Sequence, residues 1–196
     1  VNKVPVSGAD RMVLGDQIAV QDVLALARFC LFTDDDLTLA EVLKSPLIGW
    51  GEEELFALSY NRKGTLWQEV CNFDSDKITA IADANEFVRV PDLEKIKEVW
   101  DYLSRLIGRA RYMGAYEFIS YVLNMPCPAD DYSALRGIRR RLGDDALDAL
   151  EELLNVALNF SRDHIDHLQI FLDEQERTKT EIKREMDERG GQVRIM

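Results

Sequence analysis

The sequence lacks the motifs that mark a self-sufficient enzyme. It contains no GxxxxGK[ST] phosphate-binding loop, no GxGxxG, no HExxH and no GxSxG. Its three cysteines, Cys30, Cys71 and Cys127, are scattered without CxxC spacing. No apolar run approaches the roughly 20 residues that span a bilayer. We therefore expect no catalytic residue, cofactor, metal or membrane partner in this chain, and the unpaired cysteines predict a reducing compartment, the cytoplasm.

Basic residues are also in short supply. The chain has 24 Lys and Arg against 36 Asp and Glu, for a net charge of −12. A stand-alone nucleic-acid binder normally carries a basic face, because neutralising phosphates supplies its non-specific affinity. An acidic chain can still contact DNA through backbone amides or one local patch, so we expect weak duplex binding at most.

Helical periodicity accounts for most of what is present. With 46% apolar and 31% charged residues the chain is typical of a globular protein. Apolar spacing of three and four residues predicts helices at 18–31, 38–44, 52–61, 65–73, 76–86, 91–111, 115–123, 131–142, 144–159 and 165–189. Residues 3–7 and 192–196 resemble short strands. The predicted fold is an all-α, orthogonal helical bundle with short strand remnants at both termini.

Local motifs place some helix boundaries. Thr38 with Glu41, and Thr65 with Gln68, have the form of capping boxes. The turn SPLIGWG (45–51) follows the first of these helices, since the residue before a proline is disfavoured in helical conformation. Two glycines flank Trp50, which predicts an exposed side chain, whereas we expect Trp67 and Trp100 in the core.

Two clusters are open to a chemical or an ordinary interpretation. His164 and His167 are suitably spaced for one helical face, but a zinc site needs further ligands, so surface residues at a helix start are favoured over a metal-dependent enzyme. Four arginines between 136 and 141 form a basic patch. We favour a solvated face, in which the arginines pair with neighbouring acids, over a phosphate-binding site. The residues of this face are Arg136, Arg139, Arg140, Arg141, Asp130, Asp131, Asp144 and Asp145.

The two ends of the chain resemble a known family. GADRMVLGDQIAVQDVLALARF (8–29) resembles the segment leading into the 2B subdomain of UvrD-like superfamily 1 helicases, with matches at Gly8, Arg11, Ile18 and Asp22. QVRIM (192–196) resembles the strand that in this family continues into Thr-x-His-x-x-Lys-Gly-Leu-Glu. The resemblance explains why a helical chain would begin and stop on fragments of strand.

The turn between the second and third predicted helices adds to the resemblance. KSPLIGWGEEEL (44–55) is similar to the family's Asn-Thr-Pro-x-Arg-Gly-Ile-Gly turn, which touches duplex DNA through backbone amides. Ile48 stands where the family has arginine, so only the amide contact carries over. The resemblance implies a DNA-binding set of these residues: Arg11, Ser45, Gly49, Trp50 and Gly51.

More narrowly, residues 10–29, 35–49 and 182–196 resemble the alphaproteobacterial AddA type, a helicase–nuclease protein that works with AddB in double-strand break repair. The resemblance implies a strand and turn remnant of the second RecA-like domain at 1–16. The helical 2B-type insertion would occupy 17–189, and a strand remnant leading into the next helicase motif 190–196. ATP and magnesium would belong to the parent protein, whose partners would be duplex DNA and an AddB-like subunit.

One alternative belongs to a different functional class. The chain would then be a free-standing helical protein–protein interaction module, with its charged last helix as the partner surface. The two hypotheses differ in what the gene encodes after Met196: a Thr-x-His-x-x-Lys-Gly continuation favours the helicase, and a stop codon favours the free-standing module.

Overall fold

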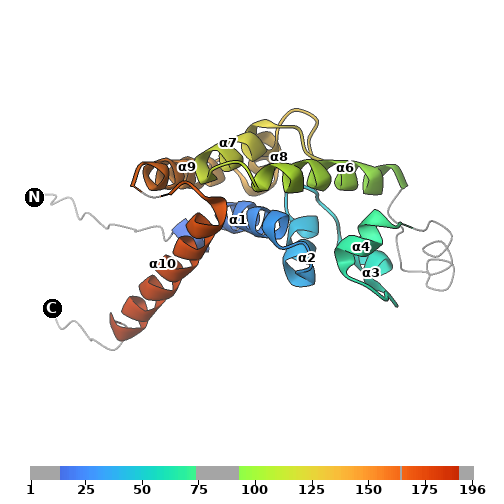
Figure 1. Cartoon of the computed structure of the whole chain (residues 1–196), viewed down its shortest axis with the longest axis horizontal. Helices are drawn as coiled ribbons and strands as arrows, with labels where there is room; N and C mark the ends of the chain where they lie inside the picture. Colours follow the sequence, from blue (N-terminus) through green and yellow to red (C-terminus); the bar gives the residue numbers. More distant parts are fainter. Residues whose placement is uncertain (1–13, 74–92, 164, 190–196) are drawn as a thin grey trace, which may run out of the picture.

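The computed structural model describes residues 14–73, 93–163 and 165–189. Within these ranges it contains nine α-helices and one short 3-10 helix, η1 (Leu14–Asp16), with no strand. The all-α prediction is therefore confirmed (Figure 1). The strand remnants predicted at 3–7 and 192–196 and the helix predicted at 76–86 lie outside the described residues. No helix in the described ranges is both long and apolar enough to cross a membrane.

The central element is α1 (Ile18–Leu31). Most of its residues are buried, on more than one face, because α2, α6, α7, α9 and α10 all pack against it. Leu26 and Phe29 are completely buried. A helix that is apolar over most of its circumference belongs in the interior of a bundle, and α1 has this position.

The second helix, α2 (Asp36–Lys44), begins earlier than predicted. Its N-cap is Asp35, whose carboxylate accepts hydrogen bonds from the amides of Leu37 (3.1 Å) and Thr38 (3.2 Å). Thr38 is buried and donates its hydroxyl to Asp35 at 2.6 Å instead of capping. The Thr38–Glu41 capping box was therefore a wrong prediction, because an aspartate three residues upstream supplies a better acceptor.

Two short helices, α3 (Glu52–Ser59) and α4 (Leu66–Cys71), form a small unit beside α2. The predicted capping box of α4 is confirmed: Gln68 N donates to Thr65 Oγ1 and Thr65 N to Gln68 Oε1, each at 3.2 Å. Asp36 ties this unit to α2, since it accepts from Leu66 N at 2.6 Å and pairs with Arg62 at 2.6 Å.

Longer amphipathic helices cover the other side of α1. They are α6 (Leu93–Ala110), α7 (Ala115–Asn124), α8 (Ala134–Leu142) and α9 (Asp145–Asp163) (Figure 1). The buried stripe of α6 includes Val99, Leu103 and Leu106, as its periodicity predicts. Trp100, expected in the core, is 41% exposed, because it lies on the edge of that stripe.

The last helix, α10 (Leu168–Arg189), projects from the body of the molecule (Figure 1). Its first turn is anchored: Phe171 is completely buried and stacks edge-on against Phe160, with ring centroids 5.3 Å apart. Glu176 reaches back to Arg28 of α1 at 3.5 Å. The start of this helix is therefore core, and residues 173–178 face outward or are half-buried, as the sequence predicts for its charged part.

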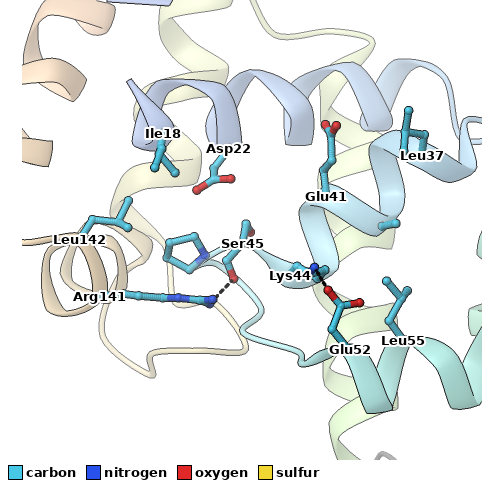
Figure 2. A pocket seen from close by; sticks show the side chains of 12 residues that line it. Ile18, Asp22, Leu37, Glu41, Lys44, Ser45, Glu52, Leu55, Arg141 and Leu142 are labelled. Atoms are coloured by element: carbon cyan, nitrogen blue, oxygen red, sulfur yellow. Dashed lines mark hydrogen bonds and ion pairs between the residues drawn. The ribbon is translucent and has the colours of Figure 1, made fainter. Parts of the chain in front are cut away.

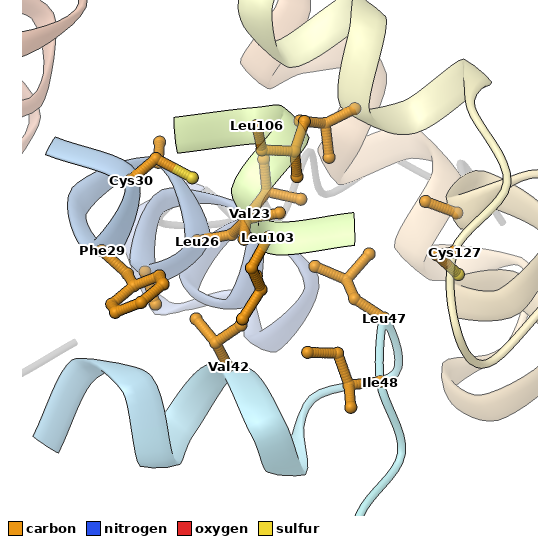
Figure 3. Packing of buried hydrophobic residues seen from close by; sticks show 14 of the residues in the cluster. Val23, Leu26, Phe29, Cys30, Val42, Leu47, Ile48, Leu103, Leu106 and Cys127 are labelled. Carbon is orange, nitrogen blue, oxygen red and sulfur yellow. The ribbon is translucent and has the colours of Figure 1, made fainter. Parts of the chain in front are cut away.

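The core extends into the turn after α2. Leu47 and Ile48, in the turn, lie with Val42, Leu103 and Leu106 in one buried cluster (Figure 3). Burying two large aliphatic side chains of a turn stabilises the fold by about 1.5–3 kcal/mol each. This anchoring fixes the turn relative to α1, α6 and the loop that precedes α8.

Candidate interface around the turn between α2 and α3

The turn at 45–51 has its large side chains facing inward. Trp50 is only 4% exposed, so the predicted exposure of this side chain was wrong. The main chain folds back on α2 here, with Trp50 N donating to Leu43 O at 2.9 Å. Gly49 permits the reversal, since its φ of 82° lies in the left-handed region that other residues rarely adopt. Trp50 therefore offers no surface for stacking on a nucleotide base.

Ser45 is also buried, and its polar atoms are bonded within the protein. Its hydroxyl donates to Val42 O at 2.7 Å and accepts from Leu47 N at 3.3 Å. Its carbonyl accepts from Gly49 N at 2.8 Å and from Arg141 at 3.3 Å. The Ser45 side chain thus stabilises the turn. Because it is buried, it presents no exposed group for the predicted contact with DNA.

The backbone amides of the turn are committed to internal hydrogen bonds. Gly49 N and Trp50 N bond to carbonyls of the turn and of α2, and Gly51 N donates to Glu54 Oε2 at 2.6 Å. Any phosphate contact through these amides would have to compete with bonds already made. Gly49 and Gly51 do remain exposed at the surface, while Arg11, the last predicted DNA-binding residue, lies outside the described residues.

Helix α8 approaches the turn closely. Its N-cap is Ser133, whose hydroxyl accepts from Arg136 N at 3.2 Å, and it ends before Gly143, where φ is 91°. Gly137 faces the turn: a Cβ there would lie 3.4 Å from the carbonyl oxygen of Pro46. The absence of a side chain at this position lets the two segments pack together.

The loop before α8 is bonded to the turn by the main chain. Ala129 N donates to Leu47 O at 3.1 Å, and Arg140 donates to Ala129 O at 2.7 Å. A cavity of about 430 Å³ lies between the two segments, lined in part by Ile48, Gly49 and Arg140. The turn, the loop and α8 therefore form one surface, although they are about 80 to 100 residues apart in sequence.

Asp130 neutralises the arginines of α8. It is buried; its Oδ1 accepts from the amides of Tyr132 (3.0 Å) and Ser133 (3.3 Å). Its Oδ2 lies 3.4 Å from Arg136 Nε and 3.4 Å from Arg140 Nη1. The pKa of this carboxyl is held below its usual range. The hydrogen bond from the Tyr132 amide lowers it most, and the Ser133 amide and the two guanidinium groups lower it further.

The other two arginines also have partners. Arg139 Nε donates to Asp144 Oδ1 at 2.5 Å, and Arg141 bonds to the Ser45 carbonyl. The interpretation of this patch as a charge-paired face is thereby supported for Asp130 and Asp144. The side chains of Arg136, Arg139 and Arg140 still remain more than half exposed.

A groove opens on the other side of Arg141, between α1, α2, α3 and α8 (Figure 2). Its volume is about 460 Å³. Asp22 of α1 faces this space, and its Oδ2 is covered from solvent without a hydrogen-bond partner among the described residues. Burial raises the pKa of Asp22 to about 6, with Arg141 lowering it and Glu41 raising it. This group was not singled out chemically from the sequence, yet a signal existed: it lies on the buried stripe of α1, three residues after Ala19 and four before Leu26.

The histidine pair has an ordinary structural role where it is described. His167 Nδ1 accepts from Gln169 N at 3.3 Å at the start of α10, while His164 lies outside the described residues. No group of three potential metal ligands occurs in the described part of the chain. The three cysteines are free, with Cys71 exposed and the other two buried.

Comparison with known proteins gives one informative relationship. No protein-family model matches the chain. A segment of 112 residues is 30% identical to the A subunit of the ATP-dependent helicase/nuclease of Clostridioides difficile (strain 630). This match covers 55% of the present chain and 9% of that protein, so the chain spans only a small fraction of the relative. The similarity relates the chain to helicase/nuclease proteins at a coarse level.

Proposed function

We propose that this chain is part of an ATP-dependent DNA helicase of the helicase/nuclease kind, with a role in double-strand break repair. The observation that supports this best is the 112-residue similarity to such a protein, at 30% identity. The all-helical architecture is compatible with a 2B-type accessory subdomain at 17–189, and the alphaproteobacterial AddA proteins are the proposed group. The proposed location is the cytoplasm and the proposed partner an AddB-like subunit.

The chain lacks the residues of a P-loop nucleotide site. The sequence has no GxxxxGK[ST] loop to cradle phosphates and hold magnesium. ATP and Mg²⁺ are therefore assigned to other parts of the parent protein, and the chain itself contributes binding and positioning without catalysis. Purified chain should hydrolyse no ATP with or without DNA, and hydrolysis that follows the protein through purification would contradict the assignment.

We place a weak duplex contact at the exposed surface formed by Gly49, Gly51 and Arg140. The two glycines allow a phosphate to approach the main chain, and the Arg140 side chain, which lines the same cavity as Gly49, is 62% exposed. The contact is weak for two reasons: the turn amides are engaged internally, and Arg140 is partly neutralised by Asp130. Arg11 remains a further proposed contact.

Fluorescence anisotropy with a labelled duplex of roughly 20 base pairs tests this contact at two salt concentrations, about 50 and about 200 mM. Arg140→Gln should weaken binding by about 3- to 10-fold and reduce the salt slope by about one, because one phosphate contact is lost. Arg105→Gln removes the same charge from an exposed position on α6 and serves as the matched control. Equal effects of the two substitutions would contradict a localised contact, and tight binding at the higher salt would contradict a weak one.

The wider assignment has its own test in the parent gene. Codons after Met196 should continue into a Thr-x-His-x-x-Lys-Gly type of motif. A stop codon at that point would instead favour the free-standing helical interaction module. The open groove beside Asp22, with exposed apolar residues at its rim, is the observation that favours this second function.

A further inference from the structure

The groove between α1, α2, α3 and α8 combines two properties that are relevant to binding. Its rim is apolar and open: Ile18 is 62% exposed and Leu37 72% exposed. Leu55 and Leu142, from α3 and α8, are half-buried along the other walls. These side chains come from four helices and face one space (Figure 2). Exposed apolar side chains around a concave space are a feature of binding sites.

The second property is the unsatisfied carboxylate of Asp22. Its Oδ2 is shielded from water, and no described residue donates a hydrogen bond to it. Arg141 is near enough to act on Asp22 electrostatically, but its Nη1 donates to the Ser45 carbonyl instead (Figure 2). A carboxylate with one covered oxygen and no donor to that oxygen is costly for the free protein, and a ligand that brings positive charge to the carboxylate reduces this cost.

The charge balance of the groove indicates the sign of the missing group. Lys44 pairs with Glu52 across the rim, and Arg141 is bonded to the main chain. Asp22 and Glu41 then remain as the acids that face the groove, and Glu41 raises the cost of ionising Asp22. An incoming cation is attracted to both, whereas a phosphate or carboxylate is repelled. The net charge of −12 also favours encounter with basic partners.

We propose that this groove binds a segment of a partner protein in which a Lys or Arg side chain is flanked by apolar residues. The cation pairs with the half-buried Asp22 carboxylate, and the apolar neighbours cover Ile18 and Leu37. A small amine would leave that rim exposed, and DNA would bring negative charge to Asp22 and Glu41, so a protein segment matches both properties. This inference adds a protein-binding surface to the function proposed above, and its test uses no DNA, so either can fail alone.

The probe is an acetylated, amidated amphipathic peptide of three to four helical turns, with one central arginine and leucines three and four residues to either side. Two matched peptides carry citrulline or glutamate in place of the arginine, since citrulline keeps the shape and removes the charge. Binding of the fluorescently labelled peptides to the full chain is measured by anisotropy. Wild type should bind the arginine peptide about tenfold or more tightly than the citrulline peptide, and the glutamate peptide least.

Substitutions in the protein locate the contact. Asp22→Asn keeps the size of the side chain and should abolish the preference for arginine over citrulline. Asp34→Asn removes the same charge from an exposed residue outside the groove and should retain it. Leu37→Ser should weaken all three peptides by a similar factor, because it removes apolar contact only. Circular dichroism checks that each variant is folded.

Several results overturn the proposal. Equal affinity of wild type for the arginine and citrulline peptides, or absence of measurable binding at millimolar peptide, shows that no cation site exists. Equal losses in Asp22→Asn and Asp34→Asn show that only overall charge matters. Sedimentation velocity that reveals an Asp22-dependent dimer assigns the groove to a second copy of this chain instead of a partner.

Discussion

Two aspartates face the arginines of α8 and are in opposite electrostatic states. Asp130 precedes α8 in the chain, and Asp22 lies on α1, more than a hundred residues away from it in sequence. The pKa of Asp130 is held below its usual range, whereas that of Asp22 is raised to about 6. The side chain of Asp130 is only 1% exposed, so burial by itself does not account for the difference.

Hydrogen bonds and nearby positive charges account for it. The Oδ2 atoms of Asp22 and Asp130 are both covered from solvent without a hydrogen-bond partner among the described residues. Asp130 is compensated, because its Oδ1 accepts from two backbone N–H groups and its Oδ2 lies 3.4 Å from two guanidinium groups, whereas Asp22 has one arginine nearby. A buried carboxylate is stable as an anion only when donors replace the water it has lost. Asp130 therefore has a structural role, and Asp22 is the one left open to a ligand.

The largest effect is expected from removing Asp130, the aspartate whose charge is compensated by its neighbours. Asp130→Ala leaves two part-buried amides without an acceptor and Arg136 and Arg140 without their shared partner. We expect the melting temperature to fall by about 5–10 °C, as measured by circular dichroism. Asp131→Ala, at the exposed neighbouring position, is the control and should change it by about 1 °C or less. A change for Asp130→Ala no larger than that of the control would remove the basis of the comparison.

Removing the charge of Asp22 should have the opposite effect and raise the free energy of unfolding. The folded protein keeps a proton on Asp22 up to about pH 6, while the unfolded chain loses it near the ordinary value of 3.8. The wild-type free energy of unfolding therefore falls as pH rises from about 4 to about 6, and Asp22→Asn lacks this fall. We expect the variant to be about 1–2 kcal/mol more stable than wild type above pH 6, the full shift being discounted because the side chain is half-buried. The two should be similar near pH 4.

Urea denaturation at several pH values measures this difference. A destabilised Asp22→Asn protein at pH 7–8 would mean that the carboxylate has a donor in solution after all.

Asp35, the N-cap of α2, is an exposed aspartate that can be compared with Asp22 and Asp130. Asp35 accepts bonds from two amides and from the Thr38 hydroxyl, which lower its pKa, the hydroxyl bond first. Asp35→Ala should cost about 1–2 kcal/mol at neutral pH, the usual range for an N-cap. Because the pKa is lowered, the stabilisation is present above the unfolded value and is lost as pH falls below it. A pH-independent difference in urea denaturation would argue against a role for the charge.

The smallest effect concerns the cap of α7. Asp166 Oδ1 accepts from Ala115 N at 2.9 Å, and a Cβ at Gly114 would lie 1.9 Å from the other carboxylate oxygen. Gly114→Ala should therefore push this side chain away and cost about 0.5–1 kcal/mol, the same as Asp166→Ala. The double variant should cost no more than either single one, because both remove the same bond. Additive costs in thermal or urea denaturation would show that the two residues act separately.

Much of the helical pattern follows from the sequence. The predicted helix at 115–123 matches α7, and that at 144–159 largely coincides with α9, because their apolar faces keep one period over their whole length. The start of α2 was misplaced since two capping motifs compete there and Asp35 has the better acceptor. The boundaries that fail are thus the ones where hydrogen-bond geometry decides.

The site was less predictable for a physical reason. Local sequence around Trp50 indicates an exposed turn, but the side chains of Leu47, Ile48 and Trp50 are buried in the core. Conversely, Trp100 fits the stripe of α6 and is 41% exposed. The groove that Asp22 shares with Arg141 of α8 joins segments distant in sequence, so no local pattern contains it.

Titration of the aspartate carboxyl carbons by nuclear magnetic resonance tests the central claim, that the charge of Asp130 is compensated by its neighbours and that of Asp22 is left open to a ligand. Asp22 should titrate near pH 6 in the free protein, and its pKa should fall when the arginine peptide is added. Asp130 should titrate below the usual value in both samples. An Asp22 carboxyl that titrates at or below the ordinary aspartate value, and does not respond to the peptide, would contradict the account.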